Sequence, residues 1–264
     1  MTETLASAST EQHVGVAGVQ LHLVRGGSGD PLLVLHHDIG NPGWLPFHRQ
    51  LAERFEVVAP SHPGYDRSER PEWMRSVRDV AVVYQWLLAD LELEAVTLVG
   101  LGFGGWVAAE MATMAPTAFR RLVLVGAMGL RPDDGEIMDQ ALVNYIEYAR
   151  AGFADQAAFD RVYGAEPSTD QLEAWDRNRE MSFRIAWKPY MYSQTLPHLL
   201  GGVKTPALVV WGSEDRIVPR SCGEQYARAL PNARLEIVPG AGHCLALERP
   251  DQLASLIDRF ATAG

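Results

Sequence analysis

The sequence of 264 residues predicts an α/β protein with a mostly parallel, doubly wound sheet and an inserted helical segment. Three observations support this prediction. Short apolar runs alternate with segments of helical periodicity, which is typical of parallel strands joined by helices. In the stretch 95–111, an apolar β-branched run passes through glycines directly into a helical pattern. The alternation stops after residue 130 and resumes after residue 202.

The first part of the chain predicts an edge hairpin followed by buried strands. Residues 14–16 and 19–24 alternate apolar and polar side chains around a short Ala-Gly turn, which favours an antiparallel hairpin. The run 32–35 is apolar throughout, as expected for a strand that is buried on both faces of a sheet. Four further elements are expected before residue 131: a helix at 47–55, a strand at 57–59, a helix at 77–91 and a strand at 122–125.

Residues 131–202 predict an inserted helical cap, which leaves 1–130 and 203–264 to form the core domain. Aromatic side chains recur through the cap, and periodicity does not separate those that pack it onto the core from those that line a pocket. The predicted pocket residues are Trp187, Tyr190 and Tyr192. After the cap, we expect a strand at 207–211, a helix at 221–230, a strand at 234–238 and a helix at 251–260.

The composition argues against several classes of partner. The chain has 33 acidic residues against 23 lysines and arginines, and its net charge of −10 would repel a nucleic-acid backbone. No apolar run approaches the ~20 residues that span a bilayer, and the first twenty residues lack the regions of a signal peptide. We therefore expect a cytoplasmic protein that binds a small molecule, without nucleic-acid or membrane partners. The sequence leaves its oligomeric state open.

Two motifs fit the glycine-rich turn. The letters G-L-G-F-G at 100–104 have the frame of a G-x-S-x-G nucleophile elbow, with Gly102 at the serine position. The glycines of 100–105 also spell G-x-G-x-x-G, the fingerprint of dinucleotide binding. That second motif needs an acidic residue about 20 positions later, yet no carboxylate follows the next strand before Asp133. The sequence therefore favours the elbow frame.

With these motifs, the chain resembles the α/β-hydrolase superfamily over nearly its whole length. Its landmarks follow the family's order: His-His at 36–37, P-G-Y-D-R-S at 63–68, the elbow frame at 100–104, G-S-E-D at 212–215 and G-H at 242–243. The resemblance implies that Asp215 is the acid and His243 the base of a catalytic triad. It also implies an oxyanion hole made by the backbone N–H of Phe103 and by one from His37, Asp38 or Ile39.

The sequence departs from the family pattern in two places. Gly102 provides no nucleophilic side chain, although glycine adopts the positive φ of an elbow without strain. This glycine is compatible with a natural loss of the nucleophile and with its deliberate removal. His37 and Asp38 replace the small residues of the oxyanion loop, whose first histidine, His36, is usually structural in the family. An inward carboxylate would repel a developing oxyanion, so Asp38 either turns away or binds substrate or shares a proton with a histidine.

These residues predict an enzyme that works without a covalent intermediate. Asp215 would fix the tautomer of His243, and His243 would act as general base on water or on a substrate proton. Hydrolysis, lyase or decarboxylase chemistry, C–C bond cleavage and cofactor-free oxygenation remain open, with a small apolar or aromatic substrate and no cofactor. The alternative is a non-catalytic receptor or carrier that binds a small ligand under the cap.

Two further chemistries are less favoured by the sequence. His36, His37, Asp38 and His243 offer metal ligands at one sheet edge, but neighbouring ligands strain a single coordination sphere, so no metal is predicted. Cys244 follows the predicted base directly. It is interpreted as a packing residue and not as a replacement nucleophile.

Overall fold

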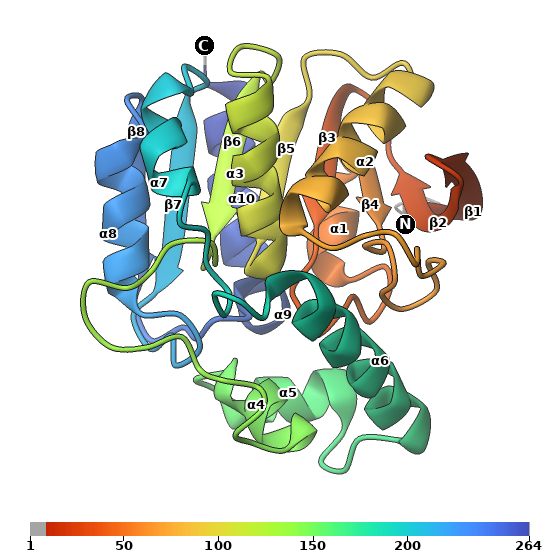
Figure 1. Cartoon of the computed structure of the whole chain (residues 1–264), viewed down its shortest axis with the longest axis vertical. Coiled ribbons are helices and arrows are strands. Elements are labelled where there is room, and N and C mark those ends of the chain that lie inside the picture. The colour runs from red at the N-terminus through yellow and green to blue at the C-terminus, as the bar shows by residue number, and fades with distance from the viewer. Residues whose placement is uncertain (1–8, 264) are drawn as a thin grey trace, which may run out of the picture.

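The computed structural model describes residues 9–263 and contains an eight-stranded sheet with helices on both faces (Figure 1). Its strand order is β1-β2-β4-β3-β5-β6-β7-β8. The pairs β1–β2 and β2–β4 are antiparallel and the other pairs are parallel, which confirms the predicted fold class. The strands are β1 (Ser9–Val16), β2 (Val19–Gly26), β3 (Asp30–Leu35), β4 (Phe55–Pro60), β5 (Thr97–Leu101), β6 (Arg121–Val125), β7 (Ala207–Gly212) and β8 (Ala233–Val238).

Helices cover both faces of the sheet because its central strands are apolar on both sides. In β3, Leu33 and Leu35 pack into one hydrophobic cluster, whereas Leu32 and Val34 pack into another. The first cluster includes α2 (Val77–Asp90), α3 (Phe103–Met114) and α8 (Arg220–Ala229), and the second includes α1 (Pro46–Leu51) and α10 (Pro250–Thr262). The predicted helix 47–55 is too long: it ends at Leu51, since Phe55 already begins β4.

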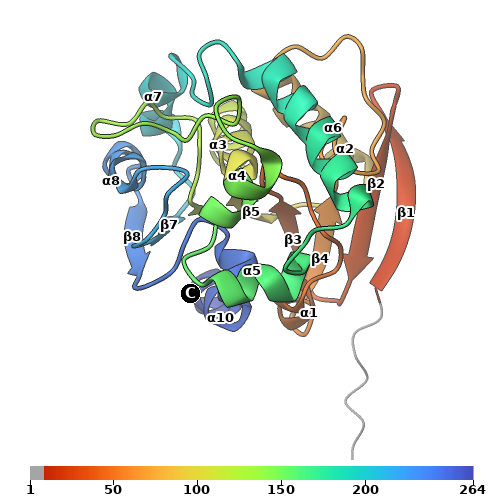
Figure 2. The same cartoon turned by 90° about the horizontal axis from the view of Figure 1, so that it is seen from below.

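The segment between β6 and β7 is helical. It contains α4 (Tyr145–Ala151), α5 (Gln156–Tyr163), α6 (Thr169–Ala186), α7 (Leu196–Leu199) and the 3-10 turn η1 (Leu200–Gly202). Figure 1 shows α4, α5 and α6 beyond the carboxyl ends of the strands, and Figure 2 shows them across this edge from below. In contrast, α7 returns to the sheet and packs beside α3. The loops after the parallel strands therefore face α4, α5 and α6.

A buried carboxylate ties this segment to the loop that precedes His243. Glu248, in the short helix α9 (Leu245–Glu248), accepts hydrogen bonds from the backbone N–H groups of Gly242 (2.8 Å), Ala154 (3.2 Å) and Asp155 (3.0 Å). Two of these amides lie between α4 and α5. Within residues 9–263, no helix is both long and apolar enough to cross a bilayer.

Candidate active site

The turn at Gly102 joins β5 to α3. Gly102 has φ 54° and ψ −112°, a combination that is unfavourable for residues with a side chain. Its N–H donates to the Val125 carbonyl (2.8 Å), and its carbonyl accepts from the Met128 N–H (3.0 Å), so the end of β6 and the loop after it hold the turn. Helix α3 begins at Phe103, whose N–H belongs to the first turn and is not used by the helix itself. Within residues 9–263 this amide has no hydrogen-bond acceptor, so it is a donor available beside Gly102.

The structure brings His243 and Asp215 together. His243 Nδ1 lies 2.8 Å from Asp215 Oδ2, and Asp215 Oδ1 accepts from the backbone N–H groups of Ile217 and Val218, each at 2.9 Å. A Cβ added at Gly126 would lie 3.0 Å from His243 Nδ1, so glycine at this position leaves space for the imidazole ring. With Nδ1 donating to the carboxylate, the lone pair of His243 is on Nε2.

Electrostatics favour the protonated form of His243 despite its burial. Burial lowers the pKa of this imidazole, but the charge and the hydrogen bond of Asp215 more than compensate. With a smaller contribution from the charge of Asp38, the pKa is raised above its ordinary value of 6.5. A raised pKa makes His243 a stronger base when it is neutral.

His37 lies next to His243 over the glycine turn. Its side chain is buried, and the two imidazole ring centroids are 4.9 Å apart. A Cβ added at Gly102 would lie 2.8 Å from His243 Nε2 and closer still to His37 Nδ1. Among the described residues, neither nitrogen of His37 nor His243 Nε2 has a hydrogen-bond partner. Burial, and then repulsion by His243 and His36, lowers the pKa of His37 well below 6.5, so its ring is neutral.

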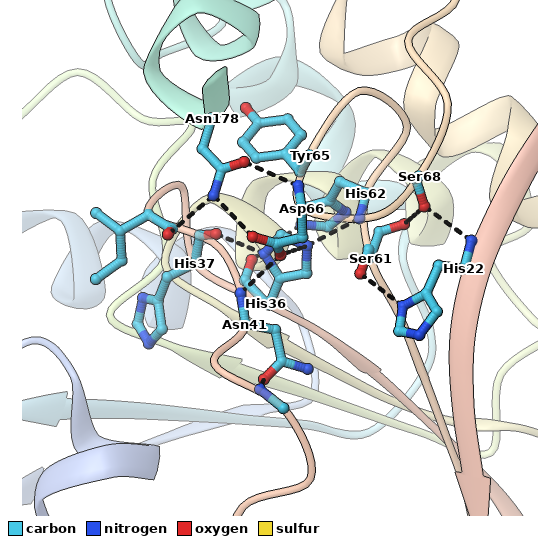
Figure 3. A network of polar contacts seen from close by, with 12 residues as sticks. His22, His36, His37, Asn41, Ser61, His62, Tyr65, Asp66, Ser68 and Asn178 are labelled. Atoms are coloured by element: carbon cyan, nitrogen blue, oxygen red, sulfur yellow. Dashed lines mark hydrogen bonds and ion pairs between the residues drawn. The ribbon is translucent and has the colours of Figure 1, made fainter. Parts of the chain in front are cut away.

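His36 belongs to a different network, drawn in Figure 3. Its Nδ1 lies 2.6 Å from the His37 carbonyl, and its Nε2 accepts from the His62 N–H at 2.8 Å. Asn178 of α6 joins the same network by donating to the Ile39 carbonyl (3.0 Å) and to Asp66 (2.9 Å). Both ring nitrogens of His36 are thus occupied, and the residue holds the loop 36–41 in place.

Asp38 points toward the helical segment between β6 and β7. Its Oδ2 accepts hydrogen bonds from the Tyr148 hydroxyl (2.8 Å) and from Gln140 Nε2. The carboxyl group is buried, and this burial raises its pKa, although the nearby His243 and the two hydrogen bonds oppose the shift. The structure thus holds the Asp38 carboxylate against this helical segment through two hydrogen bonds.

The cavities around this loop differ in size and character. A polar cavity of about 460 Å³ lies between the loop and α6, and its lining includes Ile39, Asn41, Asp66 and Arg177. Two small cavities of about 10 and 20 Å³ adjoin Asp38 and His37 respectively. A cavity of this small size holds about one water molecule.

The aromatic residues that line the cavity at Asp38 are other residues of the segment than Trp187, Tyr190 and Tyr192. Tyr145, Tyr148 and Trp175 line the cavity at Asp38. Trp187 is half exposed and packs on Phe183 and Tyr190. The Tyr190 hydroxyl accepts from the Gln140 N–H (2.9 Å), and Tyr192 forms a bridge to Gly129. Tyr190 thus supports the residue that holds Asp38.

Cys244 is enclosed beside the base. Its N–H donates to the Gly152 carbonyl (2.8 Å), and its side chain is buried. Burial, with the charges of nearby carboxylates, raises the pKa of this thiol well above 9. A protonated thiol is a poor nucleophile, which agrees with the packing role expected from sequence.

Comparison with known proteins extends this picture. Residues 32–256 match the family model described as "Alpha/beta hydrolase family". The chain is 27% identical to a 2-hydroxymuconate semialdehyde hydrolase of a Pseudomonas species, over 92% of this chain and 91% of that protein. Two similar solved structures are a membrane phospholipase A (TM-score 0.82, 25% identity, 96% and 85% of the chains) and a meta-cleavage product hydrolase of Pseudomonas fluorescens (TM-score 0.75, 22% identity, 99% and 100%). The chain therefore belongs to the α/β-hydrolase family.

Proposed function

We propose that this protein is a hydrolase in which His243 activates water directly, because residue 102 provides no nucleophile. One observation carries the proposal. The point at which a Cβ of residue 102 would stand lies between two buried imidazole nitrogens, His37 Nδ1 and His243 Nε2, and neither has a partner among the described residues. Both nitrogens face the space over Gly102, and a water there, farther from the Gly102 Cα than a Cβ would be, would hydrogen-bond to both.

The chemical step uses the lone pair on His243 Nε2. This nitrogen accepts a proton from the water while the hydroxide oxygen attacks the carbonyl carbon of the substrate. Asp215 holds the ring in the required tautomer and stabilises the imidazolium that forms. His37, which is neutral, orients the water through its second hydrogen bond. The imidazolium then returns the proton to the leaving group, which is released as the second product.

The developing oxyanion needs donors in the same space. The N–H of Phe103 is one, and we assign the second to the loop His37–Ile39, as in related enzymes. Asp38 has a raised pKa and is held by Tyr148 and Gln140, and both features reduce its repulsion of an oxyanion. The neighbouring carboxyl is therefore compatible with this chemistry.

The substrate that fits the proposal is a small carbonyl compound with an apolar or aromatic part. The names of relatives such as 2-hydroxymuconate semialdehyde hydrolase support a hydrolytic reaction on a small carbonyl compound. We further propose that 131–202 act as a cap over the core formed by 1–130 and 203–264. Tyr145 and Trp175 from this cap line the cavity at Asp38, which has room for about one water molecule and would have to widen to receive the apolar part.

The test is turnover of a panel of small activated esters and vinylogous diketones. We expect the parent protein to hydrolyse at least one of them and His243→Ala to be slower by about 10²-fold or more, the usual contribution of a general base. His13→Ala changes an exposed histidine and serves as the matched control. Equal rates in His243→Ala and the parent would refute the proposal. Binding of panel compounds without turnover would favour the receptor alternative.

A further inference from the structure

The pair of histidines over Gly102 has a carboxylate beside it. The side chains of His37, Asp38 and His243 each offer one ligand atom, and these three atoms lie within 4.8 Å of one another. All three side chains are buried, at 2 to 3% relative exposure. We propose that His37, Asp38 and His243 form a binding site for a divalent transition-metal ion. Two imidazoles and one carboxylate on one side of a space are a donor set that suits zinc or iron(II).

The donor atoms are available for a metal ion. Among residues 9–263, both ring nitrogens of His37 and Nε2 of His243 lack hydrogen-bond partners although they are buried. Buried polar atoms are satisfied in the great majority of cases, so His37 Nδ1 and His243 Nε2, which both lie beside the Cβ position of residue 102, call for a ligand. Both side-chain hydrogen bonds to Asp38 go to Oδ2, and we assign Oδ1 as its ligand atom.

The surroundings match those of metal ligands in proteins. A ligating histidine usually donates its other ring N–H to a carboxylate, and His243 Nδ1 is 2.8 Å from Asp215 Oδ2. A ligating carboxylate is usually hydrogen-bonded in turn, as Asp38 is by Tyr148 and Gln140. These partners hold two of the three ligands in place.

Closing the site requires a small movement of one residue. Metal–ligand bonds of about 2.0–2.2 Å place neighbouring ligand atoms about 3–3.5 Å apart. In the structure, the three ligand atoms are up to 4.8 Å from one another, so they must come closer together. His37 can supply this movement, because no hydrogen bond from the described part of the chain holds its ring. Its neighbour Asp38 is a compatible second ligand because the loop turns back at this point, where the Gly40 N–H donates to the His37 carbonyl (3.0 Å).

Metal binding does not depend on the proposed hydrolytic function. A metal ion on His243 Nε2 occupies the lone pair that a general base needs. The metal-bound protein and the protein that activates water through His243 are therefore two states of one site. Added zinc should inhibit turnover that is measured in chelator-treated buffer, and removal of the zinc should restore it.

The experiment is calorimetric titration of Zn²⁺ into the chelator-treated full chain. We expect one equivalent of Zn²⁺ to bind. His37→Ala and Asp38→Asn should each weaken binding by at least about tenfold, because loss of a residue that only supports a ligand already weakens metal binding about 10–100-fold. His13→Ala, an exposed histidine, should bind like the parent. Mg²⁺ prefers oxygen ligands and should not bind measurably.

Co²⁺ provides a second readout, since its visible absorption bands report nitrogen and oxygen ligation. His37→Gln, which fills a similar volume, guards against a variant that merely fails to fold, as checked by circular dichroism. Loss of the cobalt bands in folded His37→Gln supports the site. Absence of one-to-one zinc binding to the parent would overturn it, and so would equal affinity in the parent and both ligand variants.

Discussion

The His37 ring occupies the space that a side chain at position 102 would need. The imidazole of His37 stands where the side chain of residue 102 would begin. The glycine therefore does two things: it adopts the positive φ of the turn, and it leaves space for a ring from a different loop. The side chain of a serine introduced at this position would clash with the His37 ring.

We predict that Gly102→Ser destabilises the protein and that His37→Ala relieves much of this effect. The single change adds a side chain at positive φ and overpacks the space, and each effect costs about 1–3 kcal/mol. The two substitutions should therefore be coupled by about 0.5–3 kcal/mol in a double-mutant cycle of urea unfolding. Additive free energies would show that the two residues do not compete. The double variant, unlike Gly102→Ser alone, should also gain an acyl-enzyme burst with activated esters.

At the scale of elements, helix α9 links the base to the helices over the sheet edge. Glu248 binds the backbone before His243 and the backbone between α4 and α5 with one buried carboxylate. The position of the His243 loop is thus coupled to that of α4 and α5. Because three amide donors depend on this single side chain, it has no simple substitute.

We predict that Glu248→Ala lowers the free energy of unfolding by about 3 kcal/mol or more. The change removes the acceptor of one buried amide, at Gly242, and of two partly buried amides, at Ala154 and Asp155, and an unsatisfied buried group costs about 1–3 kcal/mol. Glu94→Ala removes an exposed glutamate and should change stability by less than about 0.5 kcal/mol. Chemical denaturation of the three proteins provides the measurement. A Glu248→Ala protein as stable as Glu94→Ala would contradict the link.

The sequence predicted the elements better than it predicted the site. Strand β5 and helix α3 follow directly from apolar periodicity and glycine positions, and the landmarks of Asp215 and His243 follow from the family resemblance. The partners of Asp38 could not be predicted, because Gln140 and Tyr148 lie 102 and 110 residues away in a segment without strand-like periodicity. The orientation of the His37 ring could not be predicted from sequence either, because it depends on packing between three loops.

At the scale of the whole molecule, buried histidines make stability depend on pH. Burial lowers the pKa of His36, His37 and His62, and burial together with Arg49 lowers the pKa of His48 to about 3. A group with a lowered folded pKa stabilises the native state above its unfolded pKa of about 6.5, and this stability is lost as the pH falls. The raised pKa of His243 makes stability fall as the pH rises, but only above about pH 6.5. The raised pKa of Asp38 reduces the number of protons taken up on unfolding below pH 6.5 by at most one.

We therefore predict that the protein loses stability as the pH falls from about 6.5 to about 5. The loss should be at least about 1.4 kcal/mol per pH unit, the slope for net uptake of one proton on unfolding. His48→Gln should reduce this slope by up to about 1.4 kcal/mol per pH unit, because one proton fewer is taken up on unfolding. The exposed control His13→Gln should leave the slope unchanged. Urea unfolding at several pH values gives the slopes. A flat profile would show that these histidines are not kept neutral in the native state.

The central claim is that His243 activates water without a covalent intermediate. Its most direct test is the pre-steady-state time course of ester hydrolysis, combined with intact-mass analysis of the quenched protein. The account predicts product release that is linear from the first turnover, no acyl adduct on the protein, and loss of this rate in His243→Ala. A burst of about one equivalent, with an acyl group attached to His37 or to any other side chain, would contradict it.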